Sequence, residues 1–435
     1  MARILVIGGG TAGAATALAL HRAGHEATVY EAHPDAAEDL GAFLTLASNG
    51  MRALAQIDAA AAVTAAGFPL TTMRVLDGSG TELATRPLGE ADDPLLRYRC
   101  LRRGELNATL QAEAVRRGID IRHGARLLSV QDGPDAVTAR FADGSTASGD
   151  LLIGADGLNS AVRRSVAPAA RPRYAGEHVF YGCTTDAPTA AERESGRITF
   201  LRGTAAAFGY AVSPAGETYW FCRVAGEPSA GRELTDGVPA LWRELLVPLL
   251  RADAARSDRA PAADIVEATA DGVMVTRATE MPPATPWHSG RVLLIGDAAH
   301  AASPATGQGA SMALEDAVVL AKALRDAPDT ERALTAYEAL RRPRVEHNIT
   351  VSGQISRRDH SPAAAPQGSP TPQSAPTRQS APTSQGALTP HRASAPQGAP
   401  APRPADDELI RQLEWDTDLW SLITSGEQVR AAGRR

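Results

Sequence analysis

Residues 4–13 have the sequence Ile-Leu-Val-Ile-Gly-Gly-Gly-Thr-Ala-Gly and decide the fold. The apolar run is typical of a buried strand, and the alanine-rich stretch over residues 14–23 favours a helix. Gly8 permits a tight turn, Gly10 lets a pyrophosphate approach the backbone, and Gly13 lets the helix pack on the strand. Because the first N–H groups of a helix bind phosphates, this unit predicts a dinucleotide-binding turn in an α/β fold.

The acid at position 31 narrows the choice of dinucleotide. Residues 27–30, Ala-Thr-Val-Tyr, predict a second strand that ends at Glu31, about 20 residues beyond the glycines. A carboxylate at this place accepts hydrogen bonds from the adenosine ribose and disfavours a 2′-phosphate. The tightly bound nucleotide is therefore predicted to be FAD or NAD rather than NADP.

A second junction between a strand and a helix distinguishes FAD from NAD. The run 291–295, Arg-Val-Leu-Leu-Ile, leads into Gly296 and Asp297, and residues 303–309 open a helix predicted over 310–324. The carboxylate of Asp297 can accept hydrogen bonds from the ribitol of FAD, which NAD lacks. The glycines let the positive end of the helix dipole face a flavin ring. The pattern indicates FAD, and an unrelated strand-helix turn is the alternative.

A third motif lies midway along the chain. Leu151-Leu-Ile153 predicts a buried strand, and Asp156 follows it after Gly154 and Ala155. The acid is thus expected at the carboxyl end of a strand, where α/β sheets bind ligands. Stabilisation of the turn before Gly157 is the alternative role.

Together these motifs resemble the single-component FAD-dependent aromatic hydroxylases, the class A flavoprotein monooxygenases of the para-hydroxybenzoate hydroxylase type. The resemblance extends from Met1 to about Arg358 and implies an α/β fold: a Rossmann-like FAD-binding domain, an antiparallel-sheet substrate domain and C-terminal helices. It rests on the glycine run with Glu31, Arg103-Gly-Glu-Leu106, Gly154 to Ser160 with Arg163, Gly296 to Gly309, and Tyr337 to Val345.

The resemblance also implies which residues bind the cofactor. Arg103 contacts FAD, Asp156 supports both FAD and the reducing pyridine nucleotide, and Asp297 binds the ribitol. Arg102 is an adjacent alternative to Arg103. His300 belongs to the flavin-binding turn, and proton transfer is its alternative role. The predicted cofactor-binding residues are Gly8, Gly10, Ala12, Gly13, Glu31, Arg103, Leu127, Asp156, Asp297, Pro304, Gly307, Gly309 and Ala310.

A monooxygenase reaction is what the resemblance implies. NADPH or NADH, as a transient co-substrate, reduces the flavin, which reacts with O2 to give a C4a-hydroperoxide that hydroxylates an aromatic or polycyclic small molecule. The protein holds the substrate and excludes water. Epoxidation, Baeyer–Villiger oxidation and, in another class, a flavin-binding interaction protein are alternatives. By the resemblance residues 41–46 pass beside the flavin; they lack a basic residue, which favours a neutral, larger substrate.

The stretch between the second and third motifs predicts the substrate sheet. Residues 198–201, 207–212 and 218–224 are expected to form successive antiparallel strands. By period two, Phe208 and Tyr210 share one face, and Trp220 shares a face with Cys222 on the next strand. Phe208, Tyr210 and Trp220 are predicted to line the substrate pocket, with an ordinary core or sheet-helix contact as the alternative.

These segments predict the domain organisation. Residues 1–171 form the first part of the FAD-binding domain, with an excursion to the substrate domain near 70–98; within it, residues 119–122 and 137–141 are expected in a small meander. The substrate sheet follows over 172–284, and 285–358 complete the FAD-binding domain. A disordered Pro/Ala/Ser-rich linker is expected over 359–405. Residues 406–435 are expected to form an amphipathic helix that docks on the body, over the substrate entrance or as a partner-binding helix.

Lysine and cysteine usage excludes several kinds of site. Lys322 is the only lysine, which excludes a P-loop and Schiff-base chemistry, and it is expected to be exposed. Flavin-dependent halogenases need a lysine after the first FAD segment and a tryptophan-rich motif, and both are missing here. Cys100, Cys183 and Cys222 are too widely spaced for a zinc site or a disulfide framework, so buried thiols are expected.

Composition restricts the partners. The formal net charge of −6 argues against nucleic acid and anionic membranes, and aromatics make up only 4% of the 435 residues. The sequence has neither a signal-type apolar segment nor a run of about 18 apolar residues that could span a membrane. We therefore expect a cytoplasmic monomer or homodimer that binds a small-molecule substrate, O2 and NAD(P)H, and no metal.

Overall fold

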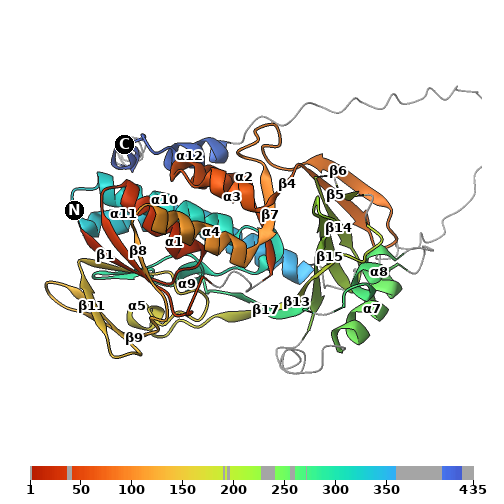
Figure 1. Cartoon of the computed structure of the whole chain (residues 1–435), viewed down its shortest axis with the longest axis horizontal. Helices are drawn as coiled ribbons and strands as arrows, with labels where there is room; N and C mark the ends of the chain where they lie inside the picture. Colours follow the sequence, from red (N-terminus) through yellow and green to blue (C-terminus); the bar gives the residue numbers. More distant parts are fainter. Residues whose placement is uncertain are drawn as a thin grey trace, which may run out of the picture.

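The computed structural model describes residues 2–36, 42–189, 192–193, 196–226, 241–254, 260–270, 272–358 and 404–423. At its centre lies a six-stranded sheet of order β18-β19-β12-β1-β2-β8 (Figure 1). All neighbouring strands in it are parallel except β18 and β19, which confirms the predicted Rossmann-like α/β class. The strands are β1 (Arg3–Ile7), β2 (Glu26–Tyr30), β8 (Asp120–Arg122), β12 (Leu151–Gly154), β18 (His288–Ser289) and β19 (Val292–Leu294).

The register of the central strands brings the three sequence motifs to one edge. Ile7 is paired with Gly154, and Gly154 is paired with Leu294, so β1, β12 and β19 end at the same level. The loops that follow them therefore lie next to one another at the carboxyl ends of the strands, where α/β proteins bind ligands.

Helices pack against this sheet and against one another. The helix α1 (Thr11–Arg22) contacts both α4 (Arg103–Arg116) and α10 (Gly309–Asp326), as Figure 1 shows. Small alanine side chains buried along α1 allow this close contact. The remaining helices of this part are α2 (Ser48–Gln56), α3 (Ala60–Ala66), α5 (Arg163–Val166), α9 (Asp297–His300) and α11 (Thr330–Arg358).

A small antiparallel meander lies beside the central sheet. It consists of β9 (Leu127–Asp132), β10 (Val137–Phe141) and β11 (Thr146–Gly149). The expectation that residues 119–122 belong to this meander was wrong. Residues 120–122 of this stretch form β8, which pairs in parallel with β2, so Ile121 extends the central sheet and not the meander.

A seven-stranded sheet forms the second half of the molecule, in the order β17-β13-β16-β15-β14-β5-β6. One of its faces packs on α7 (Leu241–Asp253) and α8 (Pro261–Glu267), as seen at the right of Figure 1. The other face meets a three-stranded sheet of β3 (Phe43–Leu46), β7 (Tyr98–Arg102) and β4 (Phe68–Leu70). The strands of the large sheet are β5 (Thr72–Asp77), β6 (Glu82–Pro87), β13 (Arg173–Thr184), β14 (Arg197–Arg202), β15 (Ala206–Val212), β16 (Thr218–Ala225) and β17 (Met274–Glu280).

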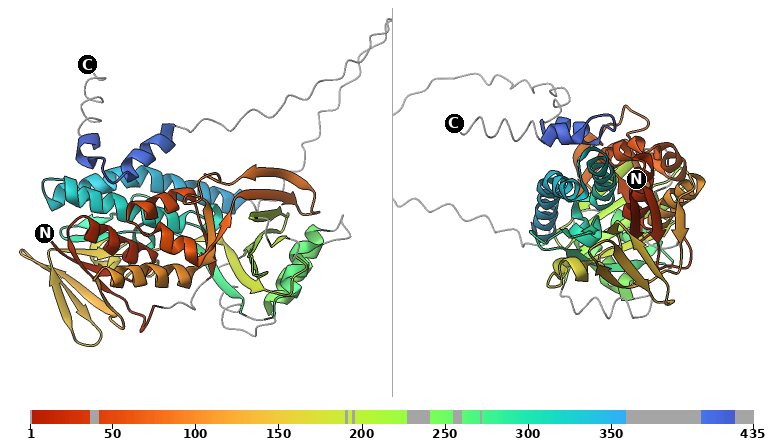
Figure 2. Two further views of the ribbon diagram at one scale, coloured as in Figure 1. Left: turned by 45° about the horizontal axis from the view of Figure 1, so that its top comes forward. Right: turned by 90° about the vertical axis from the view of Figure 1, so that its left-hand side faces the viewer.

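Residues 404–423 lie on the outer side of the helical layer, as the left view of Figure 2 shows for α12 (Pro404–Leu413). The expected single helix over 406–435 was wrong: α12 ends at Leu413, and a turn separates it from a short helical stretch over 419–423. Residues 424–435, and 359–403 of the predicted linker, lie outside the described residues. The domain boundaries remain predictions.

Within the described part of the chain, every helix is too short or too polar to cross a membrane.

Candidate functional site

The glycine turn after β1 has the geometry that a phosphate-binding loop requires. Gly8 has φ +104°, and a Cβ at this position would lie 2.5 Å from the carbonyl oxygen of Ala155. A Cβ on Gly13 would lie 1.8 Å from the carbonyl oxygen of Gly8. By contrast, no heavy atom among the described residues would come within 4 Å of a Cβ on Gly10. Backbone atoms therefore leave no room for a side chain at Gly8 and Gly13. The space beside Gly10, before the first turn of α1, is free of described atoms.

The first turn of α1 is available to an anion. Gly10 is its N-cap, and within the described part of the chain no side chain caps this helix. The first N–H groups of such a helix bind phosphate oxygens. Ala12 lies beside the third motif, since a Cβ on Gly296 would be 3.0 Å from the Cβ of Ala12. The open turn therefore fits the pyrophosphate of a dinucleotide.

Glu31 lies at the end of β2, next to the glycine turn. One of its carboxylate oxygens accepts a hydrogen bond from the Gly9 N–H at 2.5 Å, and the other accepts one from the His33 N–H at 2.7 Å. These bonds hold the carboxylate beside the turn. A carboxylate oxygen can accept more than one hydrogen bond, so Glu31 retains capacity for the ribose hydroxyls.

Arg103 and Asp297 come together from two distant motifs. The Arg103 guanidinium Nη2 lies 3.9 Å from Asp297 Oδ2, and both side chains remain partly exposed. The alternative residue, Arg102, points away: it donates hydrogen bonds to the Tyr219 hydroxyl at 3.4 Å and to Glu217 at 3.2 Å. Of the two arginines, Arg103 is therefore the one placed among the predicted cofactor residues.

Asp156 is bound within its own loop. Its Oδ1 accepts a hydrogen bond from the Ser160 hydroxyl at 2.5 Å, and its Oδ2 accepts one from the Ala161 N–H at 2.6 Å. Arg163, two residues beyond Ala161, donates to the carbonyl oxygen of Ala298 at 2.9 Å and so ties this loop to the third motif. The geometry agrees with the turn-stabilising alternative, and contact of Asp156 with FAD stays a prediction.

The third motif ends in an uncapped helix. Pro304–Thr306 form a single 3-10 turn, and Gly307 has φ +66°, a left-handed conformation that favours glycine. The helix α10 then begins at Gly309, and no side-chain hydrogen bond from the described residues caps it. The half-buried Ala310 lies in its first turn. The open N-terminus of α10 therefore fits the electron-rich pyrimidine edge of a reduced flavin.

Leu127 is the one predicted cofactor residue that lies outside these loops. It is buried at the start of β9. Its role at the cofactor stays a prediction.

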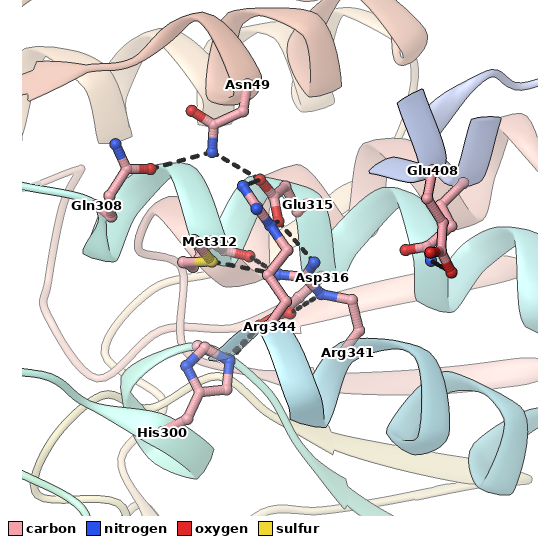
Figure 3. A network of polar contacts seen from close by, with 11 residues as sticks. Asn49, His300, Gln308, Met312, Glu315, Asp316, Arg341, Arg344 and Glu408 are labelled. Atoms are coloured by element: carbon pink, nitrogen blue, oxygen red, sulfur yellow. Dashed lines mark hydrogen bonds and ion pairs between the residues drawn. The ribbon is translucent and has the colours of Figure 1, made fainter. Parts of the chain in front are cut away.

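A buried ionic network connects α9, α10 and α11, and the sequence did not predict it (Figure 3). His300 Nε2 lies 2.5 Å from Asp316 Oδ2, and the same oxygen accepts the Gly296 N–H at 3.1 Å. Arg341 donates to Asp316 at 2.8 Å and to Glu315 at 2.6 Å. Burial alone would raise the pKa of Asp316, but the charges of His300 and Arg341 outweigh it and hold this pKa well below its ordinary value.

The network places His300 in a structural role. Its imidazole is buried, with the Trp287 ring at 5.1 Å on one side and Asp316 on the other. The only sequence signal for the network was the Tyr337–Val345 motif, which contains Arg341. Asp316 occupies only the Nε2 of His300, so proton transfer remains the alternative role of this residue.

The proposed pocket aromatics lie on the helix side of the large sheet. Phe208, Tyr210 and Trp220 are buried in the cluster formed with α7 and α8. Phe208 stacks on Trp220 with ring centroids 5.7 Å apart, and the Trp220 indole N–H donates to the Thr269 hydroxyl at 2.9 Å. This is the sheet-helix contact that the sequence left open, so the pocket assignment is not supported for these residues.

The opposite face of the same strands is turned toward β3 and β7 and carries other aromatics. Tyr181 pairs with Phe221 across β13 and β16, and Phe43 of β3 packs on Tyr219 with ring centroids 5.6 Å apart. This face is close to the cofactor residues, since Phe43 of β3 pairs with Arg102 of β7, the residue before Arg103. Within the predicted flavin-adjacent segment 41–46, only residue 41 lies outside the described residues.

A fully buried acid joins this face to the flavin loop. Glu177 of β13 lies 3.5 Å from Arg223 of β16 and accepts a hydrogen bond from the Ser303 hydroxyl at 3.2 Å. It also accepts one from the Ser356 hydroxyl of α11 at 2.8 Å. Ser303 immediately precedes the 3-10 turn, so the acid connects the large sheet with the loop that leads to α10.

The lysine and cysteine expectations were partly wrong. Lys322 is fully buried, because the C-terminal segment covers it. Its ammonium group donates to the carbonyl oxygens of Gln412, at 2.7 Å, and Glu414. The three cysteines are free thiols. Cys100 and Cys222 are buried as expected, whereas Cys183 is only half-buried.

Comparisons with known proteins agree with this site. Residues 1–352 match the family described as "FAD binding domain". The aurachin C monooxygenase/isomerase of Stigmatella aurantiaca is 32% identical over 359 residues, which cover 81% of this chain and 88% of that protein. The 3-amino-4-hydroxybenzoate 2-monooxygenase PtnB3 of Streptomyces platensis is 33% identical over 368 residues, covering 83% and 89%.

Solved structures give the same result. The crystal structure of Klebsiella pneumoniae HpxO complexed with FAD and uric acid has a TM-score of 0.71 and 29% sequence identity, covering 83% of this chain and 89% of that one. The family match spans most of the chain, and the residues at the sheet edge fit the cofactor. The chain therefore belongs to the FAD-binding domain family and is an FAD-dependent monooxygenase.

Proposed function

We propose that this protein hydroxylates a neutral, planar aromatic or polycyclic small molecule with NADPH or NADH as the reductant. Bound FAD supplies the redox and oxygen-activating chemistry. The residues of the chain orient the cofactor, hold the substrate and exclude water from the site. Similar proteins act on aromatic compounds: their names include 3-amino-4-hydroxybenzoate and urate.

The observation that supports an aromatic substrate is the aromatic face of the large sheet. Tyr181 and Phe221 lie side by side on it, and Phe43 approaches Phe221 with ring centroids 6.5 Å apart. Aromatic rings bind planar ligands by stacked and edge-to-face contacts. Because Phe43 on this face pairs with Arg102, the neighbour of Arg103, a ring held here would lie beside the proposed cofactor residues.

The charges on this face favour a neutral substrate over a carboxylate. Arg102 forms an ion pair with Glu217, and Arg223 forms one with Glu177. An arginine already paired with a carboxylate is a poor partner for a second one, because the substrate must displace the first. This agrees with the missing basic residue in 42–46.

The cofactor contacts follow from the open loops. We propose that the first turn of α1 binds the pyrophosphate, Glu31 the ribose, Arg103 and Asp297 the central part of FAD, and α10 the flavin ring. Epoxidation and Baeyer–Villiger oxidation remain alternatives because they use the same cofactor site. A need for NAD(P)H supports a cytoplasmic location, and the oligomer, monomer or homodimer, remains a prediction.

The test compares matched neutral and acidic substrates. NADPH and NADH oxidation is measured with naphthols and with the corresponding hydroxynaphthoic acids, and the product is analysed by mass spectrometry after reaction under labelled O2. We expect the neutral compounds to stimulate oxidation and to gain one labelled oxygen. The variant Arg103→Ala, with weakened FAD binding, serves as the control.

Three outcomes separate the candidate functions. A hydroxylated product supports the proposal, whereas an epoxide or a ring-expanded ester supports an alternative oxygen insertion. Stimulation by the acids alone would overturn the proposed neutrality of the substrate. Oxidation that yields only hydrogen peroxide with every compound would overturn the proposed substrate class, because the reduced flavin would then react with O2 without transferring oxygen to any of these compounds.

A further inference from the structure

The C-terminal segment, residues 404–423, contacts the last turns of three helices that are far apart in sequence. Trp415 donates its backbone N–H to Gln56, the last residue of α2, at 2.8 Å. Leu419 donates its N–H to Asp326, the last residue of α10, at 2.8 Å. Arg22, the last residue of α1, lies over the Trp415 ring at 4.7 Å from its centroid.

Two basic side chains of α10 recognise the backbone of this segment. The buried Lys322 ammonium donates to the carbonyl oxygens of Gln412 and Glu414, where α12 ends. Arg325 donates to the carbonyl oxygen of Trp415 at 2.7 Å. The last carbonyls of a helix lack partners within the helix, and cationic groups satisfy them well. The end of α12 is therefore bound specifically and not only by apolar contact.

Apolar burial accompanies these polar contacts. Leu413 and Leu419 are fully buried in the main hydrophobic core, and Leu409 and Trp415 are nearly so. Two guanidinium groups contact the Trp415 ring, because Arg325 approaches its centroid to 5.1 Å in addition to Arg22. Cation–π contacts with tryptophan are the strongest of their kind.

The three helices contacted by the segment begin at or near the cofactor site. α1 starts at the glycine turn and α10 starts at Gly309, the predicted flavin end. α2 is joined to α10 near its start, since Asn49 donates to Gln308 at 3.1 Å and to Glu315 at 2.6 Å (Figure 3). A helix transmits displacement along its axis, and the 18 residues of α10 span about 27 Å.

We propose that the last turns of α1, α2 and α10 form a peptide-binding site whose ligand is this chain's own C-terminal segment, and that its occupancy holds the cofactor-binding ends of these helices in place. The site differs from a substrate lid, since it lies at the helix ends away from the large sheet (Figure 1). The family match ends at residue 352, so the segment lies outside the part that defines the family. The proposal does not depend on the identity of the substrate.

The site also has the properties of a reversible one. Its cations lie in the last turns of helices, where they are favourable even when exposed to solvent. Loss of the segment would therefore expose apolar surface but would not leave these charges buried and unpaired. Anything that binds the folded state alone stabilises it, and the same linkage couples segment docking to FAD binding.

The test uses full-length variants and two readouts other than activity. Trp415→Ala combined with Leu419→Ala removes the ring that both arginines contact and a fully buried side chain. Arg411→Ala changes an exposed residue of the same segment and is the matched control. We expect the double variant to release FAD about tenfold faster, measured by recovery of flavin fluorescence, and to unfold at a lower temperature.

Lys322 provides the second readout, because it is the only lysine of the chain. An acylating reagent followed by peptide mass spectrometry should leave Lys322 unmodified in the wild type and in Arg411→Ala, and should modify it in the double variant. A synthetic peptide of residues 404–423 added to the double variant should protect Lys322 again and restore slow FAD release. The same peptide carrying Trp415→Ala should do neither.

Two results would overturn the proposal. Rapid modification of Lys322 in the wild type would show that the segment does not occupy the site in solution. Modification of Lys322 in the double variant with FAD release unchanged would show that the segment docks without any effect on the cofactor ends. Failure of the substrate panel under "Proposed function" would affect neither readout.

Discussion

Gly10 and Gly13 lie three positions apart, yet different atoms constrain them. Gly13→Ala would place a methyl group 1.8 Å from the Gly8 carbonyl oxygen, so the backbone must shift. We expect this variant to lose about 1–3 kcal/mol of unfolding free energy as well as FAD binding. Gly10→Ala meets no described atom within 4 Å and should leave the stability of the apoprotein unchanged.

The difference appears only when FAD is added. A methyl group at position 10 occupies the space in front of α1 that we assign to the pyrophosphate, so we expect FAD affinity to fall at least about tenfold, or about 1.4 kcal/mol. Thermal unfolding of the apoprotein and titration by flavin fluorescence measure the two effects. Wild-type affinity in Gly10→Ala would place the pyrophosphate elsewhere.

The ionic network below the flavin turn predicts a dependence on pH. The positive charges of His300 and Arg341 outweigh burial and depress the pKa of Asp316 below its ordinary 3.8. A depressed carboxylate pKa contributes stability that is fully present above pH 3.8 and is lost as the pH falls through the lower folded value. Asp316→Asn should therefore cost about 3–5 kcal/mol at pH 7 and much less when the protein is acidified below that range.

Urea unfolding at pH 7, 3 and 2 measures this difference, because the contribution of Asp316 is lost only below pH 3.8. Asp329→Asn is the matched control, because this residue accepts a hydrogen bond from the Arg332 N–H at the start of α11 and asparagine caps a helix as well as aspartate. A cost of Asp316→Asn that does not change with pH would show that the residue acts only by packing.

Residues with local signals were predictable and their distant partners were not. The glycine run and Asp297 follow apolar strands directly, so their place at the sheet edge followed from the sequence. Asp316 and Arg341 lie in the interior of two helices, and nothing local marks an ion pair between them. Lys322 was expected to be exposed because the sequence could not show that a segment 90 positions away covers it.

At the level of elements, the two faces of β15 and β16 predict different mutational effects. Phe208→Leu removes a ring from the contact with α7 and α8 and should cost about 1–3 kcal/mol of unfolding free energy without changing substrate preference. Phe221→Leu alters the face near Arg103. It should change KM and the ratio of product to NAD(P)H consumed, with little effect on the unfolding temperature.

The same substrate panel and urea unfolding check both variants. A change of substrate preference in Phe208→Leu, together with none in Phe221→Leu, would reverse the assignment of the faces.

Alternation along these strands was predictable, but the choice of face was not. Period two correctly groups Phe208 with Tyr210 and Trp220 with Cys222. Which group meets the cofactor depends on where α7, α8 and the β3-β7-β4 sheet pack, and these contacts join residues far apart in sequence. The helix-side aromatics therefore looked as suitable as Tyr181 and Phe221 on the other face.

For the whole molecule, the class of fold and the cofactor followed from the motifs because a parallel sheet aligns the carboxyl ends of its strands. The contacts that join the central sheet to the seven-stranded sheet could not be predicted from these motifs. Glu177 is fully buried and connects β13 with the flavin loop and α11, although its sequence neighbourhood is that of an ordinary strand. The docking place of the C-terminal segment also depends on the assembled helices.

The raised pKa values of the three thiols affect how readily these cysteines are oxidised during turnover. Burial raises the pKa of Cys100 and Cys222, and it raises the pKa of Cys183 to about 11. Only a thiolate reacts readily with hydrogen peroxide, so at neutral pH all three cysteines resist oxidation to sulfenic acid. A flavin monooxygenase releases hydrogen peroxide whenever oxygen transfer fails, so we expect these three thiols to stay reduced during turnover, which mass spectrometry of the protein after turnover would check.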